Sequence, residues 1–333
     1  MATDLVQYED LWLDVHAHLI PPSFAEAWNA APAPCRDGMP GLPPWSLSAA
    51  VDAMDRMGVR AAAVSVPSPG VALGNPARAA EWARRFNTES AEIVSKSLGR
   101  LGLLACLPLS DGDAAIAEIE HWSAEPDVHG FVLFTNYDGR YLGDAALRPV
   151  LAELARRRAV VLLHPTSPRH ADALCSGRPS ALVEFAFETT RAIVDLVLSG
   201  ALAENPELRL IIPHAGGSLS VLADRVALLA RAFAPTGAGS TGPDVLAALR
   251  SLYYDLSGPV LTRQLAALLG IAEPEHLLYG TDLPFMPPEP VGRWRRELAD
   301  TSLLTPASRQ AMGWDNAAKL FPRLAAAAIA NSR

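Results

Sequence analysis

Cysteine is scarce in this sequence, which has only three in 333 residues. Cys35, Cys106 and Cys175 lie far apart, and no two of them have the Cys-x-x-Cys spacing of a thiolate zinc site. Neither a disulfide framework nor a cysteine-bound zinc is indicated, and we interpret the three thiols as small, partly buried apolar side chains. A chain without disulfides suits a reducing compartment, so we expect a cytoplasmic protein.

Net positive charge and long apolar runs are also lacking. The formal net charge is -8 at pH 7, which offers no cationic surface for nucleic acid or anionic lipid. No uninterrupted apolar stretch is long enough to span a bilayer. Residues Met1 to Asp14 lack a basic patch followed by an apolar run, so we do not expect a signal peptide. Nucleic acids and membranes are therefore not expected as partners.

Apolar residues are abundant, since 50% of the chain is hydrophobic and 19% is charged. This balance suits a globular protein with a large core. At roughly 150 residues per domain the length allows two domains, but a single α/β barrel of about 250 residues with insertions fits equally well. No segment resembles a linker, so we expect one domain over residues 1–333.

Short runs rich in Val, Ile, Leu and Tyr alternate with longer segments of helical periodicity. This alternation predicts a parallel sheet with crossover helices, and eight such units close into a TIM-type (β/α)8 barrel. The expected strands are Leu11–His16, Val59–Val66, Leu101–Leu107, Val128–Phe134, Ala159–His164, Leu208–His214, Leu252–Leu256 and His276–Gly280. The expected helices are Leu47–Met57, Pro76–Leu98, Asp113–Ala124, Ala146–Arg157, Glu184–Asn205, Leu219–Ala234 and Leu261–Leu269.

Two proline-rich segments interrupt this rhythm, Pro21–Pro44 after the first strand and Pro165–Pro179 after the fifth. Both follow the carboxyl end of a strand, where the loops of a barrel build the active site. We interpret them as rim insertions that wall a pocket. A third segment, Ala234–Gly242, contains Gly and Thr and is predicted to be mobile.

Histidines gather at the predicted strand ends. His16 and His18 end the first strand, and the two-residue period of a strand points both imidazoles to one face. His164 ends the fifth strand, His214 ends the sixth, and Asp282 follows the eighth. Because the carboxyl ends of barrel strands form the catalytic face, these side chains are expected to meet there.

Imidazole nitrogens and a carboxylate suit a borderline divalent cation. We expect His16, His18, His164 and Asp282 to bind one metal ion, most simply zinc, with manganese as the alternative. His214 would stand beside the open coordination position and transfer protons or polarise the substrate. The sequence therefore predicts a catalytic metal site.

These motifs resemble the metal-dependent amidohydrolase superfamily, and within it the branch named after aminocarboxymuconate-semialdehyde decarboxylase (amidohydrolase 2). The resemblance covers nearly the whole chain. Its motifs are Asp14–His18, Glu188–Thr190, Pro213–Gly217 and Gly280–Phe285.

The resemblance implies a single metal. Dinuclear members of the superfamily bridge two ions with a carboxylated lysine at a strand end, but the only lysines here are Lys96 in a helical stretch and Lys319 near the end of the sequence. The resemblance also implies a non-oxidative decarboxylase in which the metal grips the carboxylate and a neighbouring oxygen. Asp282 would then serve as the proton shuttle and His214 would assist.

The segment from Leu133 through Asn136–Asp144 to His164 indicates the subgroup, because it looks most like the 6-methylsalicylate decarboxylase type. This resemblance implies a small ortho-hydroxy aromatic carboxylate as substrate and, because relatives are commonly dimers, a homodimer. An arginine of the muconate-semialdehyde enzyme aligns near Ala50, which argues against that enzyme's dicarboxylate substrate.

Further residues are expected around the site. Arg225 is either a substrate ligand, as at the same spacing in related decarboxylases, or a surface helix arginine. Glu188 is expected to cap a helix or support a ligand histidine, and Asp255 to orient His214. Phe24, Trp45, Asn136 and Phe285 are expected to wall the substrate pocket. His170, in the loop after His164, is expected to be solvated.

Two other functions use the same residues. A hydrolase or dehydrative cyclase acting on an amide, lactone or related acyl group would use a metal-activated water whose proton passes to Asp282. A binding protein without metal on the same scaffold is the third possibility. Release of carbon dioxide from salicylates distinguishes the first function from the second, and elemental analysis tests the third.

Overall fold

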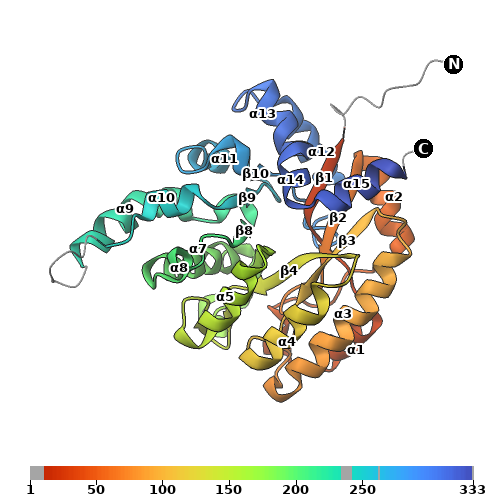
Figure 1. Cartoon of the computed structure of the whole chain (residues 1–333), viewed down its shortest axis with the longest axis horizontal. Coiled ribbons are helices and arrows are strands. Elements are labelled where there is room, and N and C mark those ends of the chain that lie inside the picture. The colour runs from red at the N-terminus through yellow and green to blue at the C-terminus, as the bar shows by residue number, and fades with distance from the viewer. Residues whose placement is uncertain (1–10, 234–241, 262, 332–333) are drawn as a thin grey trace.

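Eight parallel strands form the centre of the computed structural model, which describes residues 11–233, 242–261 and 263–331 (Figure 1). They are ordered β1-β2-β3-β4-β7-β8-β9-β10 in one sheet. Bridges from Asp14 to Tyr279 and from Ala17 to Leu283 join β1 to the segment around β10. The sheet is therefore nearly closed into the expected barrel. The strands are β1 Trp12–His18, β2 Val59–Ser65, β3 Leu101–Cys106, β4 Val128–Phe134, β7 Val160–His164, β8 Arg209–Ile212, β9 Tyr253–Asp255 and β10 Leu277–Leu278.

Helices surround these strands (Figure 1). Because each strand is covered on both faces, its residues are almost all buried and read as a continuous apolar run. The helices are α1 Pro22–Ala30, α2 Leu47–Met57, α3 Ala79–Ser95, α4 Gly112–Trp122, α5 Arg148–Arg156, α6 Ala171–Leu174, α7 Glu184–Leu198, α8 Ala201–Glu204, α9 Leu219–Ala232, α10 Val245–Arg250, α11 Arg263–Leu268, α12 Pro288–Asp300, α13 Pro306–Gln310, α14 Asn316–Leu320 and α15 Pro322–Ala330.

The ends of α2 illustrate how the sequence sets helix boundaries. Ser46 begins the helix, and its side-chain oxygen accepts a hydrogen bond from the Ala49 amide. Gly58 ends it at a φ of 67°, a left-handed conformation that costs glycine little. Val59 then opens β2, so the chain turns from helix to strand within two residues.

Several predicted boundaries were too long. The predicted strand Leu208–His214 ends at Ile212, because Pro213 has no amide to donate to the ladder and His214 has a left-handed φ of 62°. The predicted strand His276–Gly280 is reduced to Leu277–Leu278. The predicted helix Glu184–Asn205 divides into α7 and α8 at Gly200, whose φ is 81°. The helices from α12 to α15 were not predicted, and most of Ala234–Gly242 lies outside the described residues.

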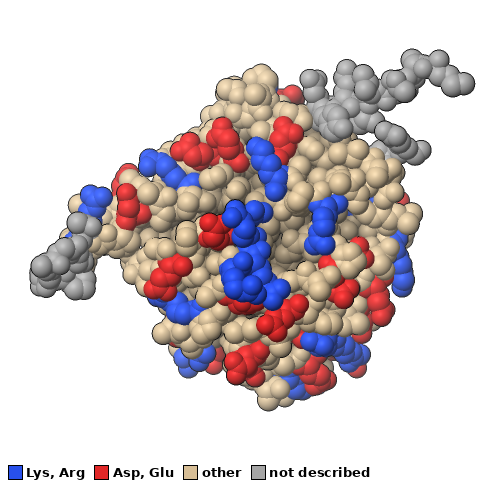
Figure 2. All heavy atoms as spheres, viewed as in Figure 1, with Lys and Arg blue, Asp and Glu red and all other residues tan. Residues whose placement is uncertain are grey.

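Charge on the surface is mixed. Figure 2 shows acidic and basic side chains interspersed over one face of the molecule, with a group of basic side chains near its centre and acidic side chains around it. Among the described residues, no helix combines the length and the apolar character that crossing a membrane requires.

His129, the second residue of β4, is a partly buried histidine outside the strand ends. Its ring covers Gly102, where an added Cβ would lie 2.5 Å from the His129 Cδ2 atom. Burial and the nearby Arg323 charge lower the pKa of His129 from 6.5 to about 4. Between these two pH values the unfolded chain binds a proton that the folded chain excludes, so the free energy of unfolding falls as the pH falls.

We expect the variant His129→Gln to lose this pH dependence. The pH-dependent change in the free energy of unfolding that the variant loses is at most about 3 kcal/mol, at roughly 1.4 kcal/mol for each pKa unit. Urea unfolding of the variant and the original protein at pH 7 and pH 4.5 measures it, because the other titrating groups cancel in the difference. His121→Gln, at an exposed histidine of α4, is the control. Parallel pH profiles for His129→Gln and the original protein would contradict this assignment.

Candidate metal centre and adjoining cavity

Four side chains meet at the carboxyl ends of the strands. His16 and His18 come from β1, His164 is the last residue of β7, and Asp282 follows β10. One nitrogen or oxygen atom from each lies within 4.8 Å of the others. The structure thus brings together the four residues that the strand-end positions predict as ligands. This group could hold a metal ion.

Each of the three histidines is held by its Nδ1 atom. His16 Nδ1 donates to Asp255 Oδ2 at 2.9 Å, because a carboxylate can only accept. His164 Nδ1 donates to the Pro165 carbonyl oxygen at 2.7 Å. His18 Nδ1 lies 3.3 Å from Ser65 Oγ. These contacts direct the three Nε2 atoms toward the centre, as metal-binding histidines require.

The Nε2 atom of His16 provides a test of whether a metal fits. It is buried and has no hydrogen-bond partner among the described residues, and the nearby Asp282 Oδ1 atom lies 3.7 Å away. A buried polar atom without a partner costs free energy, and a lone pair directed into a group of other ligands is what a cation requires. The residues present therefore fit a divalent ion.

Electrostatics at the centre also favour a cation. Burial opposes ionisation of Asp282, but hydrogen bonds with His18 and His214 hold its pKa well below the usual range. Burial lowers the pKa of His18 and of His164, so both imidazoles are neutral and able to coordinate. For His16, burial opposes protonation, yet the Asp255 charge prevails and raises the pKa to about 9, so a bound cation would take the place of a proton on Nε2. Two ionised carboxylates thus attract positive charge to this centre.

His214 stands on the solvent side of the group. Its Nε2 atom lies 3.5 Å from Asp282 Oδ2, and its side chain is 23% exposed, whereas that of His16 is fully buried. Its backbone amide donates to Asp255 Oδ1 at 3.1 Å. Asp255 was expected to orient His214, and it does so only through the backbone, since its hydrogen bond to a ring is with His16. His214 can therefore exchange protons between Asp282 and a bound molecule.

Asp14 was not predicted as part of the site, although it shares the two-residue period of His16 and His18. It is buried, and its carboxylate accepts hydrogen bonds from the His16 amide at 2.9 Å and the Thr281 hydroxyl at 2.5 Å. Burial raises the pKa of Asp14 to about 7. These bonds attach β1 to the segment that carries Asp282.

The expectation for Glu188 was wrong. This carboxylate lies beyond the first turn of α7 and is fully buried. It accepts hydrogen bonds from Asn136 Nδ2 at 2.9 Å, the Tyr141 hydroxyl at 2.8 Å and Arg191 at 2.8 Å. It therefore neither caps the helix nor contacts a ligand histidine. It fixes the hairpin of β5 (Asn136–Tyr137) and β6 (Arg140–Tyr141).

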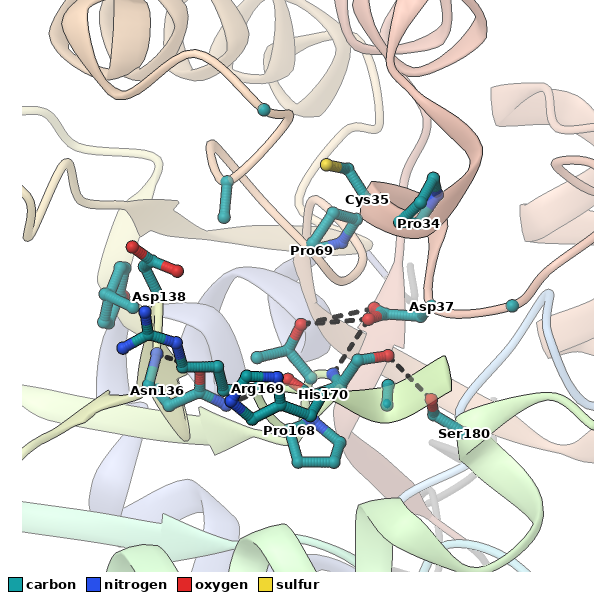
Figure 3. Close-up of a pocket in the computed structure, with 18 of the residues that line it drawn as sticks. Pro34, Cys35, Asp37, Pro69, Asn136, Asp138, Pro168, Arg169, His170 and Ser180 are labelled. Atoms are coloured by element: carbon teal, nitrogen blue, oxygen red, sulfur yellow. Dashed lines mark hydrogen bonds between the residues drawn. The ribbon is translucent and has the colours of Figure 1, made fainter. Parts of the chain in front are cut away.

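A cavity of about 880 Å³ lies between loops that follow several of the barrel strands (Figure 3). Its walls come from the loops after β1, β2, β3, β4 and β7, and both proline-rich segments contribute to it. Asn136 and His170 line it, but none of the four centre residues does. Thr166 of the cavity wall follows His164 by two residues, and the Phe134 ring centroid lies 6.0 Å from that of His164.

Not every residue expected in the substrate pocket reaches it. Phe24 is fully buried on α1 and packs against Phe86, with ring centroids 5.4 Å apart, so its assignment as a pocket wall was wrong. Trp45 is partly buried against the core and does not line the cavity. Arg225 is exposed on α9. Phe285 does adjoin the centre, with its ring centroid 5.5 Å from that of His18.

Comparison with known proteins shows what the chain is similar to. The family model described as "Amidohydrolase" matches residues 13–323. A 6-methylsalicylic acid decarboxylase of Penicillium expansum is 34% identical over 322 residues, covering 94% of this chain and 96% of that protein. A crystal structure of an amidohydrolase II is 30% identical with a TM-score of 0.85, covering 93% and 99% of the two chains. A dihydroxybenzoic acid decarboxylase of Polaromonas sp. JS666, solved with manganese and 2-nitroresorcinol, shares the fold at 23% identity and a TM-score of 0.76, covering 94% and 96%.

Proposed function

Since the chain belongs to the amidohydrolase family, we propose that it is a metal-dependent, non-oxidative decarboxylase of a small ortho-hydroxy aromatic carboxylate. The observation that carries this proposal is the convergence of His16, His18, His164 and Asp282. Among the described residues, none forms a hydrogen bond with the buried His16 Nε2 atom. The 34% identity to a 6-methylsalicylic acid decarboxylase over almost the full length of both chains supports the substrate class.

A divalent cation bound by these four residues would supply the positive charge that holds the substrate carboxylate and its neighbouring hydroxyl oxygen. We expect zinc, because three imidazoles and a carboxylate suit it; manganese, which a fold neighbour binds, is the alternative. Elemental analysis of protein purified without added metal identifies the ion.

Asp282 is the proposed proton shuttle. It is ionised at rest, because hydrogen bonds with His18 and His214 outweigh the effect of burial on its pKa. It therefore first accepts the proton of the substrate hydroxyl and then returns it to the ring carbon. A π electron pair of the ring forms the new C–H bond at the carbon that bears the carboxylate. The bond to the carboxylate then breaks, its electron pair restores the aromatic ring, and carbon dioxide leaves. The phenolate oxygen left behind takes a proton from solvent through His214. His214, 3.5 Å from Asp282, stabilises the charge and exchanges protons with solvent.

The side chains proposed to contact the substrate differ in position. Phe285 adjoins the centre through His18 and is placed to pack against an aromatic ring. Asn136 is fixed by Glu188 at the cavity wall, with its amide also donating to the Ser167 carbonyl at 3.1 Å. Arg225, at an exposed position of α9, is a candidate to bind the substrate carboxylate.

The low pKa of Asp282 also favours the alternative, a hydrolase or dehydrative cyclase in which this carboxylate takes a proton from an attacking water. Both functions use the same residues, so the products must distinguish them.

We expect purified protein to convert 6-methylsalicylate, salicylate or 2,6-dihydroxybenzoate to the corresponding phenol and carbon dioxide. Mass spectrometry of a panel of hydroxybenzoic acids measures the loss of the carboxyl group, and enzyme treated with a chelator is the control. Hydrolysis of lactones or anilides without release of carbon dioxide would instead support the hydrolase. Turnover of neither panel by metal-loaded protein would contradict both.

A further inference from the structure

The three histidines of the centre are not held in the same way. His16 donates to a carboxylate carried by another strand. His164 donates from Nδ1 to the carbonyl of the next residue, Pro165, at 2.7 Å. The ring orientation of His164, and hence the direction of its Nε2 atom, depends on where the backbone of residues 165–167 places that carbonyl.

This backbone segment is held from the side by Asp37, which comes from the loop after α1. Asp37 Oδ1 accepts a hydrogen bond from the Ser167 amide at 2.8 Å and one from the Thr166 hydroxyl at 3.1 Å. Figure 3 shows these bonds as dashed lines from Asp37 to the loop that carries Pro168. The Thr166 amide donates in turn to Thr135 Oγ1 at 3.1 Å, so the peptides after His164 are fixed from two sides.

Asp37 has features that a simple surface loop does not require. Only 4% of the residue is exposed, and its φ of 52° is left-handed. Its other carboxylate oxygen accepts a hydrogen bond from the Ser68 hydroxyl, of the loop after β2. Within the part of the chain that the structure describes, no Lys, Arg or His forms an ion pair with it. A buried carboxylate held only by neutral donors is costly, and only a carboxylate offers acceptors on both oxygens.

We propose that Asp37 is a positioning residue for His164, acting through the Thr166 and Ser167 peptides and the Pro165 carbonyl. This role of Asp37 rests on the proposed metal site, in which His164 is a ligand. By accepting from three donors, Asp37 joins the loops after β1, β2 and β7, and it fixes the acceptor that sets the tautomer and direction of the His164 ring. Among the described residues, the Asp37 side chain forms hydrogen bonds with Ser68, Thr166 and Ser167 and with none of the four proposed metal ligands.

The variant Asp37→Asn tests this proposal. An asparagine presents a single acceptor oxygen, and its amide group would face the donors of Thr166, Ser167 or Ser68. We expect metal affinity to fall about 10- to 100-fold, the usual effect of removing a group that orients a ligand. Competition between the full-length protein and a chelator for zinc, and separately for manganese, measures the dissociation constant without an activity assay.

Asp138→Asn is the matched control, because Asp138 lines the same cavity, has a left-handed φ of 54° and is exposed. Its metal affinity is expected to equal that of the original protein. A second pair of variants keeps the test decisive if Asp37→Asn does not fold. Thr166→Val removes one donor to Asp37 and should weaken metal binding, whereas Thr166→Ser keeps the hydroxyl and should restore it.

The outcomes are distinguishable. If the original protein binds metal and both Asp37→Asn and Thr166→Val bind it equally well, the role of Asp37 is overturned while the proposed function stands. A lower melting temperature with unchanged metal affinity also overturns it, since that is what a merely structural role predicts. If the original protein binds no divalent metal, the metal site and this proposal fall together.

Discussion

Asp282→Asn is expected to lower kcat for decarboxylation by about 10² to 10⁴-fold, the usual contribution of a positioned general acid or base. Asparagine keeps the size of the side chain but can neither accept the hydroxyl proton nor return one to the ring carbon. It also removes the negative charge 3.0 Å from His18 Nε2. Rates of carbon dioxide release at saturating metal and substrate measure the effect.

The control for this variant is Asp113→Asn, at an exposed position in the first turn of α4. Its rate should match that of the original protein. Metal content must be measured for both, because Asp282 is also a proposed ligand. If Asp282→Asn, fully loaded with metal, retained more than a third of the original rate, the assignment of Asp282 as proton shuttle would be wrong.

Removal of the divalent metal is expected to abolish turnover and to lower the melting temperature. Without a cation, the ionised Asp282 lacks its proposed partner, and none of the described residues forms a hydrogen bond with His16 Nε2. A ligand that binds only the folded state at 100 times its dissociation constant stabilises that state by about 2.7 kcal/mol. Both quantities are measured after chelation and again after addition of zinc or manganese. The assay of activity tests the loss of turnover, and thermal unfolding tests the fall in melting temperature.

Matched variants separate loss of the metal from other effects of chelation. His16→Gln removes a ligand and should prevent reconstitution by either ion, whereas His276→Gln, at a histidine that donates to the Arg250 carbonyl far from the centre, should not. Full turnover by metal-free protein would exclude the metal-dependent mechanism, and normal metal binding by His16→Gln would exclude His16 as a ligand.

The order of strands and the residues at their ends were predictable, because they depend on local pattern. A buried parallel strand reads as a short apolar run, and its last polar residue marks the rim. His16, His18, His164 and Asp282 were found in this way. The two-residue period that joined His16 to His18 also indicated Asp14, whose role was missed although its side chain lies on the same side of β1.

The partners of these residues were less predictable. Glu188 was assigned from its place near a helix start, but its hydrogen bonds go to the β5–β6 hairpin. Phe24 was assigned from its place after β1, but α1 turns it into the core against Phe86. Sequence position gives the element on which a side chain lies, but the packing of that element decides which way the side chain faces.

The sequence by itself determined a barrel with three histidines and a carboxylate at one rim, since parallel strands bring their carboxyl ends to the same edge whatever separates them in the chain. The tertiary structure alone decided what directs these ligands. Asp255 reaches His16 across 239 positions and Asp37 reaches Ser167 across 130, because barrel closure and loop packing are cooperative results of the whole chain. No local pattern around either carboxylate specifies its partner.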